Sequence, residues 1–240
     1  MYFRHAPEIW REYPQLVPGV LVVGGIDAQA DVAARLEPFY ARARARLGAG
    51  AESDLPEVAA WRRAYAQMGM KPTQYRSAAE ALLRRFRRGD RLPQLHPLVD
   101  LCNAVSLAFA LPVAVFDLAG VAEYLEVRHA RGDEHYLAFS GETEQPAPGE
   151  VVFADAEDQV HARRWTFRQS RRSTVGPATR RALIVSEGLH ASAGADVRAL
   201  LGTLAAELAA VWAPPERSAI LTAEAPRLDF DEEGIDRIAT

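Results

Sequence analysis

The sequence predicts an α+β fold in which helices flank a mixed or antiparallel sheet, within a single compact domain. Helical periodicity dominates before residue 110, short β-branched and aromatic segments fill residues 113 to 185, and an alanine-rich helical stripe follows. Because the strands are grouped and do not alternate with helices, the pattern disfavours a doubly wound parallel sheet. A chain of 240 residues has ample length for one domain with a real core.

The first part of the chain, residues 1–69, is predicted to be mainly helical. Val20–Asp27 reads as a short buried strand that ends in a Gly-Gly turn. That pair lacks the spaced third glycine of a dinucleotide-binding fingerprint. Apolar residues then recur at helical spacing from Asp31 to Leu47, and a second helix is expected to begin near Pro56.

Two further helices open the central part, residues 70–187. Ser77 and Glu80 form a capping box, because each side chain can satisfy a free backbone amide at a helix start. Gly89 is expected to end this helix in the left-handed conformation. Pro97 suits the first turn of the next helix, which should reach about Phe109 and is apolar on every side.

The pattern changes to strands beyond Pro112. The segments are short and are separated by turn chemistry such as Arg131-Gly-Asp133. The predicted strands are Val113–Phe116, Leu125–Arg128, Tyr136–Phe139, Val151–Phe153, Val160–Phe167 and Ala182–Val185. In the last part, residues 188–240, a helix from about Gly194 to Trp212 is followed by Pro214-Pro215 and a tail with acidic residues at Asp229, Asp231, Glu232, Glu233 and Asp236.

Charge is distributed unevenly. The net charge of −4 argues against a general nucleic-acid binder. Positive charge is almost wholly arginine, with Lys71 as the only lysine, and arginines cluster between residues 76 and 91 and between residues 163 and 181. Two interpretations stay open: these clusters are solvated faces, or they contact phosphate, whose oxygens suit guanidinium forks.

Several classes of site find no support in the sequence. The one cysteine, Cys102, cannot form an internal disulfide and fits a cytoplasmic protein. The N-terminus lacks an apolar signal region, and no segment is long and apolar enough for a membrane span. The six histidines lack metal-ligand spacing, and no cofactor-binding motif is present, so we expect neither a metal nor a cofactor.

The buried helix carries polar exceptions at Asp100, Asn103 and Ser106. A buried polar group left unpaired costs about 1–3 kcal/mol, so each needs a partner. Asn103 either binds neighbouring backbone or an arginine, or faces a pocket and orients a ligand. Residues 160–169 alternate as a strand, with Arg164 and Thr166 on one side, and could stack a base or form a core edge. The other side carries Arg163, Trp165, Phe167 and Gln169.

Two segments together resemble the B3/B4 domain of the phenylalanyl-tRNA synthetase beta subunit, and more closely the free-standing B3/B4 proteins. One runs from His96 to Leu107 and reaches Leu111–Leu118; the other is Gly149–Asp155 followed by Ala162–Gln169. The resemblance covers residues 70 to 187 and implies a B3/B4-like mixed sheet. In the synthetase this domain hydrolyses wrongly charged tyrosyl-tRNA.

Particular positions match that family and others depart from it. Asn103 lies nine residues before Pro112, as the family asparagine lies before the proline of its Pro-Met-His-Ala-Phe-Asp motif, while Cys102 stands in place of a threonine. The motif histidine falls on Ala114. The glutamate that reads the tyrosine hydroxyl falls near Val185, where we expect no carboxylate, so the substrate should differ from tyrosyl-tRNA.

These features lead to three functional hypotheses. The first is a free-standing hydrolase that edits misacylated aminoacyl-tRNA in trans; the second is a non-enzymatic RNA- or amino-acid-binding module; the third is an unrelated small-molecule enzyme on the same fold. The expected partner is a tRNA acceptor end or an aminoacyl-tRNA, whose phosphates would meet Lys71, Arg76 and Arg84. The expected substrate-binding residues are Asn103, Asp117, Arg164, Trp165 and Gln169. The sequence identifies no catalytic residue.

Overall fold

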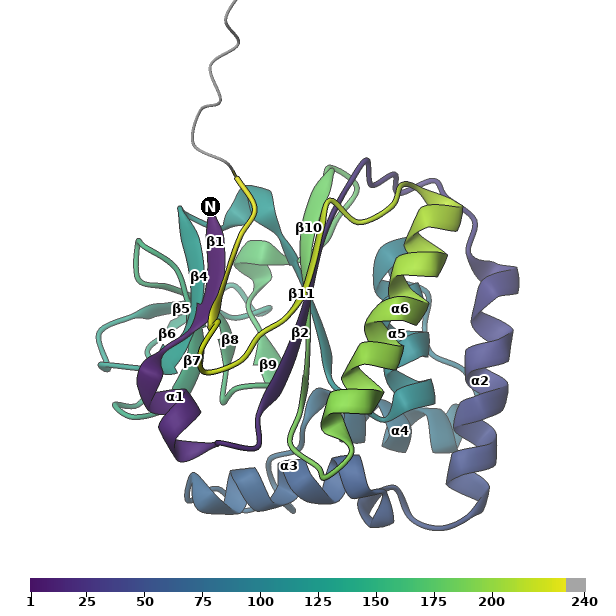
Figure 1. Ribbon diagram of the computed structural model, residues 1–240, viewed down its shortest axis with the longest axis horizontal. Helices are drawn as coiled ribbons and strands as arrows, with labels where there is room; N and C mark the ends of the chain where they lie inside the picture. The colour runs from purple at the N-terminus through teal and green to yellow at the C-terminus, as the bar shows by residue number, and fades with distance from the viewer. Residues whose placement is uncertain (232–240) are drawn as a thin grey trace, which may run out of the picture.

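Two β-sheets lie face to face, and helices cover the outer face of one of them (Figure 1). The computed structural model describes residues 1–231. Sheet A has the strand order β12-β1-β4-β7-β8-β5-β6, with β9 beside β8. Its strands are β1 (Tyr2–His5), β4 (Tyr124–His129), β5 (His135–Leu137), β6 (Thr143–Glu144), β7 (Val151–Ala154), β8 (Gln159–Arg163), β9 (Arg168–Gln169) and β12 (Arg227–Asp229).

Sheet B is an antiparallel sheet with the strand order β11-β2-β10-β3. Its strands are β2 (Val17–Gly24), β3 (Val113–Asp117), β10 (Arg181–Gly188) and β11 (Arg217–Ile220). Alternate residues of a strand point to opposite faces, so β10 serves two cores. Leu183 and Val185 face sheet A, whereas Ala182 and Ile184 face the helices.

The helices of the described residues form the third layer and close one end. They are α1 (Pro7–Glu12), α2 (Ala33–Gly48), α3 (Pro56–Gln67), α4 (Ala78–Gly89), α5 (Pro97–Phe109) and α6 (Ala193–Val211), with short 3-10 turns η1 (Glu52–Asp54), η2 (Leu118–Gly120) and η3 (Arg171–Ser173). α5 and α6 pack on sheet B, and α2 and α4 pack on α5. α3 lies across one end of the two sheets (Figure 1). The predicted α+β class with a mixed sheet is confirmed, because β1 and β4 pair in parallel beside antiparallel neighbours.

The helix signals of the central part are confirmed with two corrections, the first being that the Glu80 carboxylate binds Arg62 (2.8 Å) and does not complete the capping box. Pro97 is the first residue of α5, and almost all of that helix is buried, as its apolar sequence predicts. The Ser77 hydroxyl accepts a hydrogen bond from the Glu80 amide at the start of α4. The left-handed residue at the end of α4 is Asp90 (φ 54°), not Gly89, which is still helical. Aspartate tolerates this conformation better than most side chains.

The N-terminal part contributes more strand than its sequence indicated. The expected strand is β2, which pairs with β10 along its whole length. In addition, β1 lies between β4 and β12 in sheet A. Strands β11 and β12 occur after α6, where we expected only a tail. Among the acidic tail positions, Glu232, Glu233 and Asp236 lie outside the described residues.

The predicted strand from Val160 to Phe167 is wrong in its second half. β8 ends at Arg163, and the chain reverses before β9 begins at Arg168. Arg164 and Trp165 both have positive φ angles, 48° and 57°. The alternation expected over residues 160–169 therefore stops at the turn. Its sequence gives no glycine or asparagine to mark this reversal, which is the usual signal for a positive φ.

No helix within residues 1–231 is both long and apolar enough to cross a lipid bilayer.

The Glu134 carboxylate predicts acid sensitivity of the β4–β5 connection. It is fully buried and lies against the Arg128 guanidinium and the backbone amides of Arg131 and Gly132. Burial by itself raises the pKa of this carboxyl group, but the hydrogen bonds lower the pKa by more. The net change is from 4.5 to about 2. Stability from a depressed carboxyl pKa is present above the unfolded value and is lost as pH falls towards the folded value.

The unfolding free energy of the wild type should therefore fall more steeply between pH 4.5 and pH 2 than that of Glu134→Gln. Urea unfolding at a series of pH values measures this difference. Glu142→Gln, at an exposed carboxylate between β5 and β6, is the matched control and should follow the wild-type curve. Parallel curves for all three proteins would contradict the assignment.

Candidate functional site

A cavity of about 70 Å³ lies between the two sheets. Its walls come from both sheets, from the first residue of α4 and from the turn that joins β8 to β9. The lining residues are Ala78, Pro112, Val113, Ala114, Phe153, Ala162, Trp165, Thr166, Phe167, Arg168, Gln169, Val185 and Glu187. Most of these side chains are apolar, so the few polar groups decide what the cavity can hold.

The principal buried charge of this cavity is the carboxylate of Glu187. Val185 and Glu187 are two residues apart on β10, so both point from sheet B towards sheet A. The Glu187 residue is only 2 % exposed. An isolated buried carboxylate is strongly unfavourable, so its position requires hydrogen-bond donors around it.

Three hydrogen bonds from two side chains surround that carboxylate. His5 Nε2, from β1, lies 2.6 Å from Oε1. The Trp165 indole Nε1 donates to both oxygens, at 3.0 Å each. A carboxylate accepts about four hydrogen bonds, so about one acceptor position of Glu187 is left for a ligand. The carboxylate also joins sheet B to both β1 and the β8–β9 turn.

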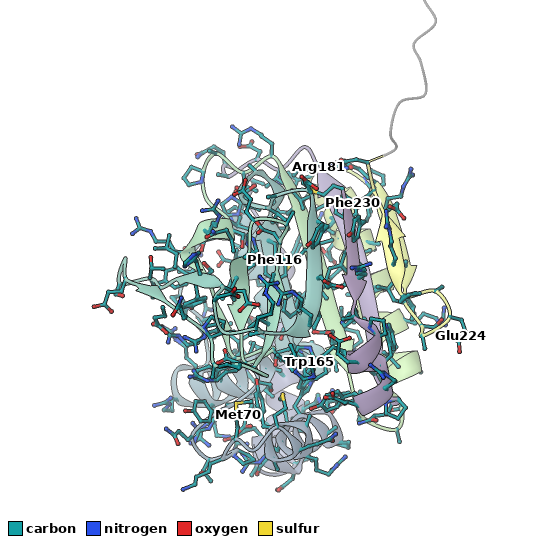
Figure 2. All side chains as sticks on the ribbon, turned by 90° about the vertical axis from the view of Figure 1, so that its left-hand side faces the viewer. Met70, Phe116, Trp165, Arg181, Glu224 and Phe230 are labelled. Atoms are coloured by element: carbon teal, nitrogen blue, oxygen red, sulfur yellow. The ribbon has the colours of Figure 1, made fainter. Side chains whose placement is uncertain are left out.

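The turn itself is held in an unfavourable backbone conformation. Each non-glycine residue with a positive φ costs on the order of 1–3 kcal/mol unless its surroundings enforce it. Here the Trp165 amide donates to the Val151 carbonyl (2.7 Å), and the Trp165 ring packs edge-on against Tyr13 (4.8 Å) and Trp61 (5.0 Å). Figure 2 labels Trp165 below Phe116, and both side chains are fully buried. The strained turn therefore positions the Trp165 indole beside the Glu187 carboxylate.

An aromatic and polar group surrounds the outer part of the turn. Tyr75 packs edge-on against Phe167 (5.4 Å), and the Arg164 guanidinium lies over the Tyr75 ring (4.8 Å). Tyr65 donates its hydroxyl to the Arg164 carbonyl at 3.2 Å, and burial raises the pKa of that hydroxyl above its ordinary value. Gln169 Nε2 donates to the Val115 carbonyl (2.6 Å) on the outer edge of β3. Gln169 thus fastens sheet A to sheet B beside the cavity.

The structure brings together only some of the residues that the sequence singled out. Trp165 and Gln169 line the cavity. Arg164 is outside the lining and contacts Tyr75. The Asp117 carboxylate accepts hydrogen bonds from the Ala119 amide (3.0 Å) and the Thr179 hydroxyl (2.6 Å). These bonds stabilise a local turn, so the carboxylate already has partners. Asn103 is half-buried on α5, on the helical side of sheet B, and is not part of the lining.

The three residues expected to contact phosphate differ in their surroundings. Lys71 is exposed in the turn before α4. Arg76 donates to the Thr73 carbonyl and lies 3.4 Å from the buried Glu80 carboxylate. Arg84 is paired with Glu52 at 3.1 Å. Both guanidinium groups therefore already have a carboxylate partner.

Sequence reasoning missed Glu187 and His5. The expectation that no carboxylate lies near Val185 is wrong, because Glu187 is on the same face of the same strand. Period-two alternation from Val185 was the available signal for Glu187. No local pattern marks His5, which is brought in by the pairing of β1 with β4. Ala114 does line the cavity, so the position matching the family histidine carries no titratable group.

Two other groups were tested as reactive or metal-binding candidates. Burial raises the pKa of the Cys102 thiol to about 12, so the thiol stays protonated at pH 7. Glu57, His190 and Asp196 offer ligand atoms within 4.8 Å of one another. The Arg46 guanidinium lies 2.6 Å from Glu57, and His190 binds Asp196 at 2.9 Å. An arginine thus already supplies positive charge there, which opposes a second cation.

The chain is similar to known proteins over much of its length. The family model described as the B3/4 domain matches residues 60–202, more than half of the chain. This chain belongs to the B3/4 domain family. The matched range contains β3, β10 and the β8–β9 turn, and therefore most of the lining of the cavity.

This chain is similar to one part of a much longer protein. The phenylalanine–tRNA ligase beta subunit of Thiobacillus denitrificans is 37% identical over 76 residues, which are 32% of this chain and 10% of that protein. This chain therefore spans about a tenth of the length of that curated relative. An N-terminal fragment of the phenylalanyl-tRNA synthetase beta subunit from Pyrococcus horikoshii aligns with a TM-score of 0.33 at 12% identity. The alignment covers 44% of this chain and 39% of that one.

The bonds to Glu187 predict unequal costs for two tryptophan substitutions. Trp165→Phe removes the N–H group that donates to a buried carboxylate, whereas Trp61→Phe removes one that donates to the Glu187 backbone carbonyl at 3.3 Å. Hydrogen bonds to charged groups contribute about 1.5–3 kcal/mol and neutral ones about 0.5–1.5 kcal/mol. Trp165→Phe should therefore lower the unfolding free energy more.

Both variants lose similar volume at fully buried positions, so each is the packing control for the other. Guanidinium chloride unfolding gives the two free energies. Equal losses, or a larger loss for Trp61→Phe, would mean that the indole of Trp165 does not stabilise the carboxylate.

Proposed function

We propose that this protein is a cytoplasmic hydrolase that edits misacylated aminoacyl-tRNA in trans. The observation that carries the proposal is the small cavity between the sheets, which has apolar walls and one buried carboxylate. Its membership of the B3/4 domain family and the likeness to a segment of a phenylalanine–tRNA ligase beta subunit support a tRNA-related role. The aminoacyl group would enter the cavity, and the tRNA would stay outside.

The dimensions of the cavity favour a small aminoacyl group. A water molecule needs about 10–15 Å³ on this measure, so 70 Å³ accommodates roughly five atoms of that size. Phe153 and Val185 would contact the side chain of the amino acid. This small volume favours the aminoacyl group over a nucleotide as the part of the substrate that enters the cavity.

Glu187 provides a polar anchor inside this apolar space. One acceptor position remains on its carboxylate after the bonds from His5 and Trp165. The α-ammonium group of an aminoacyl ester, or a side-chain hydroxyl, complements that position. The product, a free amino acid, lacks the ester to ribose. Contacts with the tRNA outside the cavity would therefore distinguish the substrate from the product.

The reaction requires little from the protein beyond placement. Water attacks the ester carbonyl carbon, the carbon–oxygen bond to ribose breaks, and the proton of the water ends on the ribose oxygen. The ester is already activated, so orientation of water and stabilisation of the developing oxyanion can supply much of the rate. The Gln169 side-chain oxygen, whose amide nitrogen is bound to Val115, is available to orient that water.

A binding module without hydrolysis is the second candidate. The observation that favours it is Ala114, which lines the cavity where the motif of the resembling domain has a histidine. With no titratable group at that position, the cavity could hold an aminoacyl group without accelerating its release. The two candidates differ in turnover, not in what they bind.

The test is a panel of tRNAs charged with correct and incorrect amino acids, incubated with the purified protein. We expect release of one class of small amino acid at least tenfold above the buffer rate. Glu187→Gln should reduce kcat/KM for that class, because the neutral amide keeps the shape but loses the charge. Glu224→Gln, at an exposed carboxylate on the edge of the molecule (Figure 2), should leave kcat/KM unchanged.

Binding of aminoacyl-tRNA without release of amino acid would select the module. Glu187 also holds His5 and Trp165, so thermal unfolding of the Glu187→Gln variant must show a folded protein. If folded Glu187→Gln retains full kcat/KM, the aminoacyl group does not use this cavity.

A further inference from the structure

A groove with three arginines lies at the far end of the helix that begins at the cavity. It has a volume of about 830 Å³ and is formed by α4 from Ala81 onwards and the segment after the helix. Its lining residues are Ala81, Leu82, Arg85, Arg88, Gly89, Arg91, Leu92 and Pro93. On α4, Leu83 and Phe86 are buried against the core, which directs Arg85 and Arg88 outwards.

These three arginines lack carboxylate partners among residues 1–231. Arg85 and Arg91 form no ion pair there, and Arg88 donates only to the Arg84 carbonyl, at 3.3 Å. The other arginines of α4 differ, because Arg84 and Arg87 are both paired with Glu52 at 3.1 Å. The arginines in the groove therefore carry uncompensated positive charge.

The acidic residue that follows α4 in the sequence is paired with an arginine outside the groove. Asp90 follows α4 directly, but its carboxylate lies 2.6 Å from Nε of Arg44. The groove is thus a local concentration of positive charge on a protein whose net charge is −4. Repulsion by the rest of the surface would weaken non-specific binding of polyanions, so a ligand must fit the groove to gain from it.

We propose that this groove binds the phosphodiester backbone of an RNA whose 3′ end reaches the cavity. The proposal rests on the function above, and it names the surface that would hold the tRNA acceptor arm. Ala78 lines the cavity and Arg88 lies ten residues further along the same helix, which is about 15 Å. A few nucleotides of a single-stranded 3′ end can span that distance.

The composition of the groove favours RNA over a lipid surface. Guanidinium groups bind phosphate oxygens as planar forks and also stack on bases, and Leu82, Leu92 and Pro93 offer apolar contact to a sugar or base. The arginines lie within a hollow, whereas a membrane-binding surface presents its basic residues around a protruding apolar face. The proposal therefore places the phosphate contacts on arginines without carboxylate partners, in place of Arg76 and Arg84, which are paired.

The experiment measures binding of a fluorescent RNA hairpin with a single-stranded 3′ end to the full chain at several salt concentrations. The comparison is between wild type and the double variant Arg85→Gln/Arg88→Gln. Each lost phosphate contact lowers the slope of log affinity against log salt by about 1, so this variant should lower it by about 2 and bind several-fold more weakly. The double variant Arg171→Gln/Arg198→Gln removes the same charge from exposed arginines elsewhere and should keep the wild-type slope.

The outcomes separate this proposal from the proposed function. If wild type releases amino acid and Arg85→Gln/Arg88→Gln changes neither slope nor KM, the groove proposal fails and editing stands. If the groove variant loses RNA affinity but no charged tRNA is hydrolysed, editing fails and the groove stands. Absence of RNA binding by wild type, or binding of anionic phospholipid vesicles in its place, overturns the groove proposal.

Discussion

The buried Glu187 carboxylate is the constraint on which the arrangement of the two sheets depends. It projects from β10 of sheet B and is bonded to His5 of β1 and to Trp165 of the β8–β9 turn. A buried carboxylate is stable only when donors surround it, so the three elements must meet at this point. Removal of one donor would leave charge uncompensated, whereas removal of an apolar neighbour would only reduce packing. The cavity lies beside this carboxylate, which is part of its lining.

The strained turn at Arg164 and Trp165 follows from the same constraint. A turn with two positive φ angles at non-glycine residues is unfavourable by itself, and the surrounding contacts compensate for it. The Arg163 guanidinium supports the preceding strand through a bidentate contact with Glu150, at 2.8 and 2.9 Å. Strain of this kind tends to occur where a side chain must be held in one position for function, and Trp165 is such a side chain in the wall of the cavity.

Arginine serves two purposes in this chain. Many guanidinium groups are structural, as the pairs of Arg84 and Arg87 with Glu52 and of Arg62 with the buried Glu80 illustrate. Others, in the groove at the end of α4, are not paired within residues 1–231. The distinction cannot be made from spacing, because Arg84, Arg85, Arg87 and Arg88 share one helix. It depends on which side of α4 faces η1, where Glu52 lies.

The amino-acid sequence by itself determined the fold class, the buried helix α5, the capped start of α4 and most strand positions, because these follow from local periodicity and capping. Of the binding residues that it suggested, Trp165 and Gln169 line the cavity. The tertiary structure alone decided that β1 and His5 join the site, that Asp117 belongs to a turn, and that Asn103 lies on the other side of sheet B. Strand alternation could have identified Glu187 as a residue that points the same way as Val185. It could not have predicted the role of Glu187, because the donors that keep its charge buried come from residues 5 and 165. Hydrogen-bond partners so distant in sequence are set by strand pairing and packing, for which a single sequence carries no local signal.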